Sequence, residues 1–180
     1  IARDRFEYTG IRDCKAAELV AGGQKACTYG CLGMSSCVKA CRFGAMTMSE
    51  NRLPVVFEEK CPGCTLCVPA CPRGIMDMLA RSQSVFVACV SKDKGKKVKD
   101  VCSVGCTGCR LCANPKVTPS GSIIMDGNLP KLDYGKEDIF EMAVQKCPQS
   151  SYAAEGDTYK SYYQKRGKGK EEEALEGAAA

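Results

Sequence analysis

The chain has 180 residues with a formal net charge of +5, and it contains 15 cysteines but no histidine and no tryptophan. The absence of histidine excludes Rieske-type ligation, mixed cysteine and histidine zinc sites, and histidine acid-base chemistry in this chain. No run of about 18 apolar residues occurs, so the sequence predicts no membrane span.

Residues 1–26 are predicted to form a lead-in with one short helix. Residues with helical spacing follow Asp13, namely Ala16, Ala17, Leu19, Val20 and Ala21, and Gly22-Gly23 provides a stop. Cys14, at the start of this helix, has no partner at motif spacing. We interpret it as a buried or free thiol.

A ligand run dominates the next stretch, residues 27–88. Cys61, Cys64, Cys67 and Cys71, followed by Pro72, have the spacing C-x2-C-x2-C-x3-C-P. In this run three cysteines bind one [4Fe-4S] cluster and the fourth binds the other cluster of a pair. A second cysteine group is therefore expected nearby.

That group lies upstream, at Cys27, Cys31, Cys37 and Cys41, with Met34 where the usual middle cysteine would be. We take Cys27 as its replacement. In such a pair, the fourth cysteine of each group binds the cluster of the other group. Cluster 1 is therefore assigned to Cys27, Cys31, Cys37 and Cys71, and cluster 2 to Cys41, Cys61, Cys64 and Cys67. Zinc is the alternative, but two interleaved sets with a Cys-Pro ending fit zinc ribbons poorly.

The rest of this stretch predicts short strands. Two flank a turn, within residues 42–48 and 53–57, and further short segments follow at 75–79 and 84–88. The basic run from Lys92 to Lys99 is interpreted as a solvated loop, or as a docking surface for an acidic redox partner.

Residues 89–150 repeat the pattern with half of its cysteines replaced. Cys102, Cys106 and Cys112 lie 75 residues after Cys27, Cys31 and Cys37. The positions that match the second cluster hold Lys116, Glu137, Phe140 and Ala143, and a packed helix is expected over residues 139–144.

The repeat retains ligands for a third cluster, which we assign to Cys106, Cys109, Cys112 and Cys147. Cys102 is the alternative to Cys109. Cys89 and Cys102 are otherwise spare thiols, and a further metal site built from them and Cys14 stays open.

The predicted fold class is therefore α+β, with two tandem bacterial dicluster ferredoxin-like modules, the second retaining one cluster. The three [4Fe-4S] clusters would bring the net charge to about −1, so the excess of Lys and Arg does not indicate nucleic acid. Residues 151–180 are a charged tail, predicted to be disordered from Lys165 to Ala180. Clustered cysteines indicate a reducing cytoplasm.

With both modules laid out, the sequence resembles the B subunit of the Rnf electron-transport complex, the membrane-bound ferredoxin:NAD oxidoreductase that couples electron transfer to ion pumping. The resemblance lies in the stretches Tyr8–Ala17, Gly22–Gly23, Cys27–Gly33, Ser36–Ala45, Cys71–Arg73, Val87–Lys96 and Gly105–Cys112. They correspond to the polyferredoxin part of that family, without its N-terminal membrane helix and small iron-sulfur domain. Because the chain opens at Ile1, we expect a processed or fragmentary product.

The resemblance implies an electron-transfer subunit that passes low-potential electrons from ferredoxin or a similar carrier to other subunits, at the cytoplasmic face of the membrane. Catalytic residues are not expected in this chain, which has neither a dinucleotide fingerprint nor a P-loop. The alternatives are the iron-sulfur subunit of a soluble dehydrogenase, hydrogenase or bifurcating complex, and a structural or oxygen-sensing cluster protein.

Overall fold

The computed structural model describes residues 2–136 and 140–154, which form two compact units that interleave along the sequence. Among these residues, unit 1 contains 2–80, 90–109 and 127–129, and unit 2 contains 81–89, 110–126, 130–136 and 140–154. The domain boundaries expected at residues 26, 88 and 150 stay a prediction. The tail beyond residue 154 lies outside the described residues.

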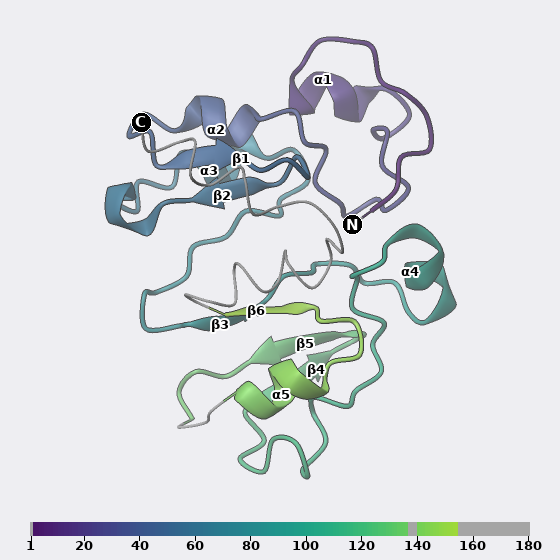
Figure 1. The fold of residues 1–180 in the computed structure, drawn as a ribbon, viewed down its shortest axis with the longest axis vertical. Helices are drawn as coiled ribbons and strands as arrows, with labels where there is room; N and C mark the ends of the chain where they lie inside the picture. Colours follow the sequence, from purple (N-terminus) through teal and green to yellow (C-terminus); the bar gives the residue numbers. More distant parts are fainter. Residues whose placement is uncertain (1, 137–139, 155–180) are drawn as a thin grey trace. The chain divides into compact units, whose positions relative to one another are not determined.

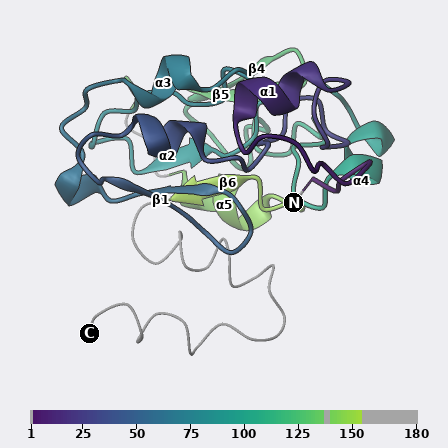
Figure 2. The same cartoon turned by 90° about the horizontal axis from the view of Figure 1, so that it is seen from above.

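Unit 1 combines short helices with one β-hairpin (Figure 1). Its elements are α1 (Cys14–Leu19), α2 (Ser36–Ala40), β1 (Met46–Met48), β2 (Pro54–Val56), the 3-10 helix η1 (Glu58–Lys60), α3 (Cys67–Ala70) and α4 (Lys96–Val101). Strands β1 and β2 are antiparallel, with Thr47 opposite Val55. Helix α2 packs against both α3 and β1, and Figure 2 shows α2 and α3 from a second direction. The predicted strands around a turn are thus confirmed.

Helix α1 begins at an aspartate cap. Asp13 Oδ1 accepts hydrogen bonds from the backbone N–H groups of Lys15 (2.9 Å) and Ala16 (3.0 Å). The bond from Ala16 is the main reason that the pKa of Asp13 lies below its usual value. The predicted helix is confirmed, but it ends at Leu19 because Val20 has an extended backbone.

Two segments of unit 1 differ from the sequence prediction. Residues 75–79 form neither helix nor strand. The basic run was expected to be a loop, yet Lys96–Val101 is helix α4. One apolar side chain explains the difference, because Val98 is 1% exposed and anchors the helix while Lys97 points to solvent.

The N-terminal segment pairs with two distant stretches of unit 1. Ala2 forms an antiparallel bridge with Cys102, and Asp4 forms one with Lys25. Lys25 Nζ also makes an ion pair with Asp4, at 2.9 Å. The segment therefore holds the approach to Cys27 against the end of α4.

Unit 2 is built on two strand pairs and one helix. Its elements are β3 (Val85–Val87), β4 (Ile123–Asp126), β5 (Leu129–Leu132, of which Leu129 belongs to unit 1), α5 (Glu141–Lys146) and β6 (Tyr152–Ala154). Strand β3 pairs antiparallel with β6, and β4 lies beside β5. The strand predicted within 84–88 is confirmed.

A hydrophobic core fills unit 2. Its buried members are Cys112, Ile123, Phe140, Ala143 and Tyr152. The rings of Phe140 and Tyr134 meet edge to face, with their centroids 5.7 Å apart. The helix predicted over residues 139–144 is confirmed from Glu141 onward, and residues 137–139 lie outside the described part of the chain.

Candidate iron-sulfur sites

Four cysteine thiols line one cavity in unit 1, which we call site 1. They are Cys14, Cys31, Cys37 and Cys71, and the cavity is completed by Leu32, Pro54, Pro72, Arg73, Ile75 and Met76. Three of these cysteines were assigned to cluster 1 from the sequence. The fourth, Cys14, takes the place expected for Cys27, which is not among the lining residues.

The thiols of site 1 lie close enough to affect one another's ionisation. Burial raises the pKa of Cys37 to about 11, and negative charge on Cys31 and Cys14 acts in the same direction. Burial likewise raises the pKa of Cys31, together with charge on Cys14 and Cys71. A metal cluster that binds here must therefore displace the protons of Cys31 and Cys37, whose thiolate forms burial disfavours.

The donor set of site 1 fits a [4Fe-4S] cluster. Each cysteine of such a cluster binds a different iron, so the four sulfurs surround a volume instead of converging on one point. Four sulfurs around a cavity with mostly apolar walls meet that requirement. By contrast, over residues 2–136 and 140–154 no group of three or more His, Cys, Asp or Glu side chains converges closely enough to hold a single metal ion.

A second group of thiols, which we call site 2, gathers at the start of α3. Its members are Cys41, Cys61, Cys64 and Cys67. Cys67 opens α3, Cys61 directly follows η1, and Cys41 directly follows α2, which packs against α3. Burial raises the pKa of Cys67. This grouping is the one expected for cluster 2.

Helices α2 and α3 each serve both sites. Cys37 lies within α2 and Cys41 directly follows it, while Cys67 opens α3 and Cys71 directly follows that helix. Each helix thus contributes one cysteine to site 1 and one to site 2. Because α2 and α3 pack together, the crossed ligation that the sequence predicts is compatible with their arrangement.

One backbone conformation recurs in three cysteine loops. A glycine with positive φ stands two residues after the first cysteine, and a second residue with positive φ stands two further on. These residues are Gly33 (72°) with Ser35 (62°), Gly63 (77°) with Thr65 (64°), and Gly108 (66°) with Arg110 (62°). Left-handed residues placed among right-handed ones make concave backbone surfaces that bind anions, including iron-sulfur clusters.

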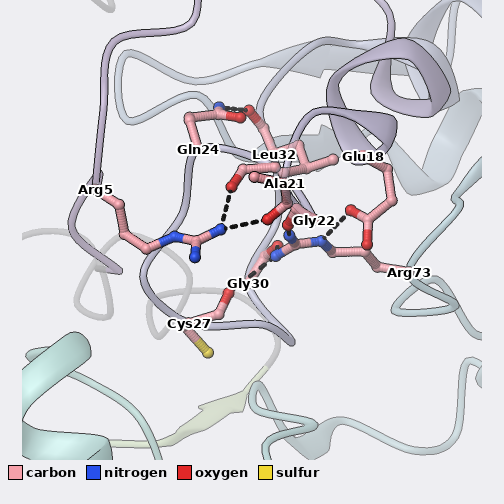
Figure 3. Close-up of polar contacts among 10 residues, drawn as sticks. Arg5, Glu18, Ala21, Gly22, Gln24, Cys27, Gly30, Leu32 and Arg73 are labelled. Atoms are coloured by element: carbon pink, nitrogen blue, oxygen red, sulfur yellow. Dashed lines mark hydrogen bonds and ion pairs between the residues drawn. The ribbon is translucent and has the colours of Figure 1, made fainter.

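Arg73 fixes the chain around site 1 (Figure 3). Its guanidinium donates to Glu18 Oε2 (2.7 Å) and to the backbone carbonyls of Cys27 (2.9 Å), Gly30 (2.7 Å) and Gly22. Figure 3 shows the Cys27 carbonyl facing this guanidinium and the Cys27 sulfur directed away from it. The backbone of Cys27 therefore contributes to the support of site 1.

Known proteins match both the ligand run and most of the chain. Residues 54–77 match the family model described as a 4Fe-4S binding domain. The B subunit of the ion-translocating oxidoreductase complex of Methanosarcina acetivorans is 42% identical over 146 residues, which are 81% of this chain and 54% of that protein. The B subunit of the Na+-translocating ferredoxin:NAD+ oxidoreductase complex of Acetobacterium woodii is 38% identical over 160 residues, which are 89% of this chain and 47% of that protein.

A third relative is the B subunit of the proton-translocating ferredoxin:NAD+ oxidoreductase complex of Clostridium ljungdahlii, 50% identical over 101 residues, which are 56% of this chain and 36% of that protein. The chain is thus similar to a part of each of these RnfB-type subunits. It spans about half the length of the first two curated relatives. The family resemblance inferred from the cysteine-containing stretches is confirmed.

The third ligand set predicted from the sequence includes residues of both units. Cys106 and Cys109 belong to unit 1, whereas Cys112 and Cys147 belong to unit 2. Cys106 and Cys112 are buried and Cys109 is exposed. The assignment of these four cysteines to one cluster stays a prediction from their spacing.

The two cysteines left unassigned, Cys89 and Cys102, lie in different units. Cys102 is half-buried at the end of α4, and Cys89 is half-buried two residues after β3.

Within the part of the chain that the structure describes, every helix is too short or too polar to cross a membrane.

Proposed function

We propose that this chain is an iron-sulfur electron-transfer subunit, which relays low-potential electrons through [4Fe-4S] clusters within an Rnf-type ferredoxin:NAD oxidoreductase complex. The observation that carries the proposal is the pair of four-cysteine sites that share α2 and α3. Two clusters held on adjacent packed helices are close neighbours, as a relay requires. The chain's own residues set the burial and hydrogen bonding of each cluster, which tune its potential.

Three clusters in two tandem ferredoxin-like modules are part of this proposal. The loop from Cys106 to Cys112 has the same pattern of positive φ as the loops of sites 1 and 2, which supports a ligand role. Related contacts also recur. Cys31 Sγ lies 4.0 Å from the Arg52 carbonyl oxygen, and Cys106 Sγ lies 3.9 Å from that of Asn128. The third cluster would be held by Cys106, Cys109, Cys112 and Cys147.

The partners follow from the relatives. Two of them are named as subunits of ferredoxin:NAD+ oxidoreductase complexes and one as a subunit of an ion-translocating complex. We therefore propose ferredoxin or a similar low-potential carrier as the donor and other subunits of the complex as acceptors. Attachment to the cytoplasmic face of the membrane would come through those subunits.

Metal analysis tests the proposal directly. Anaerobically purified chain should contain about twelve iron and about twelve acid-labile sulfide, as three cubanes require, with coupled EPR signals after reduction. About eight iron would retain the relay and remove the third cluster from it. Stoichiometric zinc with little iron would overturn the proposed function.

A reduction assay tests whether ferredoxin can donate electrons to the clusters. Reduced ferredoxin, added anaerobically, should bleach the visible absorbance of the clusters within the mixing time. Clusters that dithionite reduces but reduced ferredoxin does not would contradict ferredoxin as the donor.

A further inference from the structure

This inference rests on the proposed iron-sulfur function. We propose that Cys14, on helix α1, is the fourth ligand of the cluster in site 1, together with Cys31, Cys37 and Cys71. Cys27, the ligand expected from the sequence, then has a structural role. The site would thus be completed from outside the usual ligand run, by a residue 17 positions before its first cysteine.

The position of Cys14 supports this assignment. Cys14 is 9% exposed and lines the same cavity as the other three thiols. Four cysteine sulfurs around one cavity are a complete ligand set for a cubane.

Met34 stands in the place of a ligand in its loop. Position 34 lies between two residues of positive φ, Gly33 and Ser35, as do the cysteines Cys64 and Cys109 in their own loops. The backbone therefore places Met34 where those loops have their middle ligand. A thioether lacks the thiolate that binds iron in such clusters, so this place needs another donor.

Helix α1 supplies that donor. Met34 is 6% exposed and packs in one cluster with Cys14, Ala17 and Leu32, whereas Cys64 in the equivalent place is exposed. The difference arises because α1 covers Met34. The thiol that this helix brings to the missing ligand position is Cys14.

A hydrogen-bond network holds Cys14 in place. The backbone N–H of Cys14 donates to Ser36 Oγ at 2.7 Å, and Ser36 Oγ donates to Asp13 Oδ2 at 2.8 Å. The first turn of α1 is thereby joined to the first residue of α2, which precedes the ligand Cys37. Both cysteines thus depend on one fixed junction.

Cys27 is engaged in a different way. Its carbonyl accepts from Arg73, its sulfur is directed away from that guanidinium, and its thiol does not line the cavity (Figure 3). Gly30 lies against both Cys27 and Ala2, because a Cβ built on Gly30 would lie 3.4 Å from Cys27 Cβ and 3.3 Å from Ala2 Cβ. Cys27 therefore packs beside the N-terminal segment.

The experiment compares Cys14→Ala with Cys27→Ala in the full chain, purified anaerobically. Iron should fall by about four per chain in Cys14→Ala and stay unchanged in Cys27→Ala. The EPR signal of the site 2 cluster and the far-UV circular dichroism should persist in both variants. Unchanged iron in Cys14→Ala, or loss of iron in Cys27→Ala alone, would overturn the inference.

A rescue variant keeps the test decisive if Cys14→Ala disturbs folding. Met34→Cys, added to Cys14→Ala, restores the usual spacing of three cysteines and should recover the lost iron. If Met34→Cys does not recover the iron, the inference is contradicted. This outcome decides the question even if Cys14→Ala and Cys27→Ala both lose iron. If the unchanged chain holds zinc instead of iron, the proposed function fails before this comparison begins.

Discussion

Arg73 connects the segment after Cys71 to two distant stretches of unit 1. Its side chain is 4% exposed, and its guanidinium binds Glu18 of α1 as well as three backbone carbonyls. Lysine could not replace it, because an ammonium group lacks the planar fork that reaches several acceptors at once. The position of Cys71, which lines the cavity of site 1, depends on these bonds.

Replacement of Arg73 should loosen site 1. Arg73→Met removes the Arg73 donor from the Gly22 and Gly30 carbonyls and from the 34% exposed Glu18, whereas the Cys27 carbonyl still accepts from the Gly30 N–H. Loss of these hydrogen bonds should cost about 1–3 kcal/mol. Each 1.4 kcal/mol corresponds to about a tenfold change in an equilibrium. We expect release of the site 1 iron to a chelator to be about tenfold faster than in the unchanged chain.

Arg42→Met is the matched control for that measurement. Arg42 directly follows Cys41 as Arg73 follows Cys71-Pro72, but its side chain is exposed. Its iron release should match that of the unchanged chain. Equal release rates for both variants would show that the Arg73 contacts do not stabilise the site.

At the same residue scale, the ligand spacing in the sequence assigns to one cluster three of the four cysteines that line the cavity of site 1, namely Cys31, Cys37 and Cys71. The ligand assignments themselves stay predictions. Cys14 could not be placed from spacing alone, because its distance from the run depends on how α1 folds back. One signal was available, since Cys14 and Cys27 have the same separation as Cys89 and Cys102. The positive φ of Ser35, Thr65 and Arg110 could not be predicted either, because these residue types rarely adopt it.

The helices and strands show the limits of pattern reading in so small a protein. The hairpin of β1 and β2 and the helix α5 follow alternation and helical spacing, and both were predicted. Helix α4 was missed because only two of its residues, Val98 and Val101, are apolar, and only Val98 is fully buried. A single buried valine does not produce a detectable period in a run of charged residues.

Helix α5 stabilises unit 2 through Phe140, which precedes it and is 9% exposed in the core. Truncation of a buried phenylalanine typically costs about 3–5 kcal/mol, since the contacts are lost and a cavity remains. Phe140→Ala should therefore lower the thermal midpoint of the chain by several degrees. Differential scanning calorimetry under anaerobic conditions measures this shift.

Met142→Ala is the control within the same helix. Its side chain is 44% exposed, so the midpoint should change little. A similar fall in both variants would show that the effect of Phe140→Ala does not come from lost core packing.

At the scale of the whole molecule, the proposed third cluster determines whether the proposed relay extends beyond sites 1 and 2. Cys109→Ala and Cys112→Ala should each lower iron by about four per chain and retain the EPR signals of the other two clusters. Cys109 is the cleaner probe because it is exposed, whereas Cys112 also packs in the core of unit 2.

Cys102→Ala completes that comparison. Iron should stay unchanged if Cys109 is the ligand. Loss of four iron in Cys102→Ala, with full iron in Cys109→Ala, would reverse the assignment. Loss of all iron in any of these variants would show that the modules do not fold independently.

Because α1 covers Met34, site 1 should be less accessible to oxygen than site 2. Site 1 has two buried cysteines, Cys14 and Cys37, and two half-buried ones, whereas Cys64 of site 2 is open to solvent. Oxidants reach exposed sulfur first. A chain left in air should therefore lose its colour in an ordered way, beginning at site 2, while the cluster beneath the helix outlasts its neighbour.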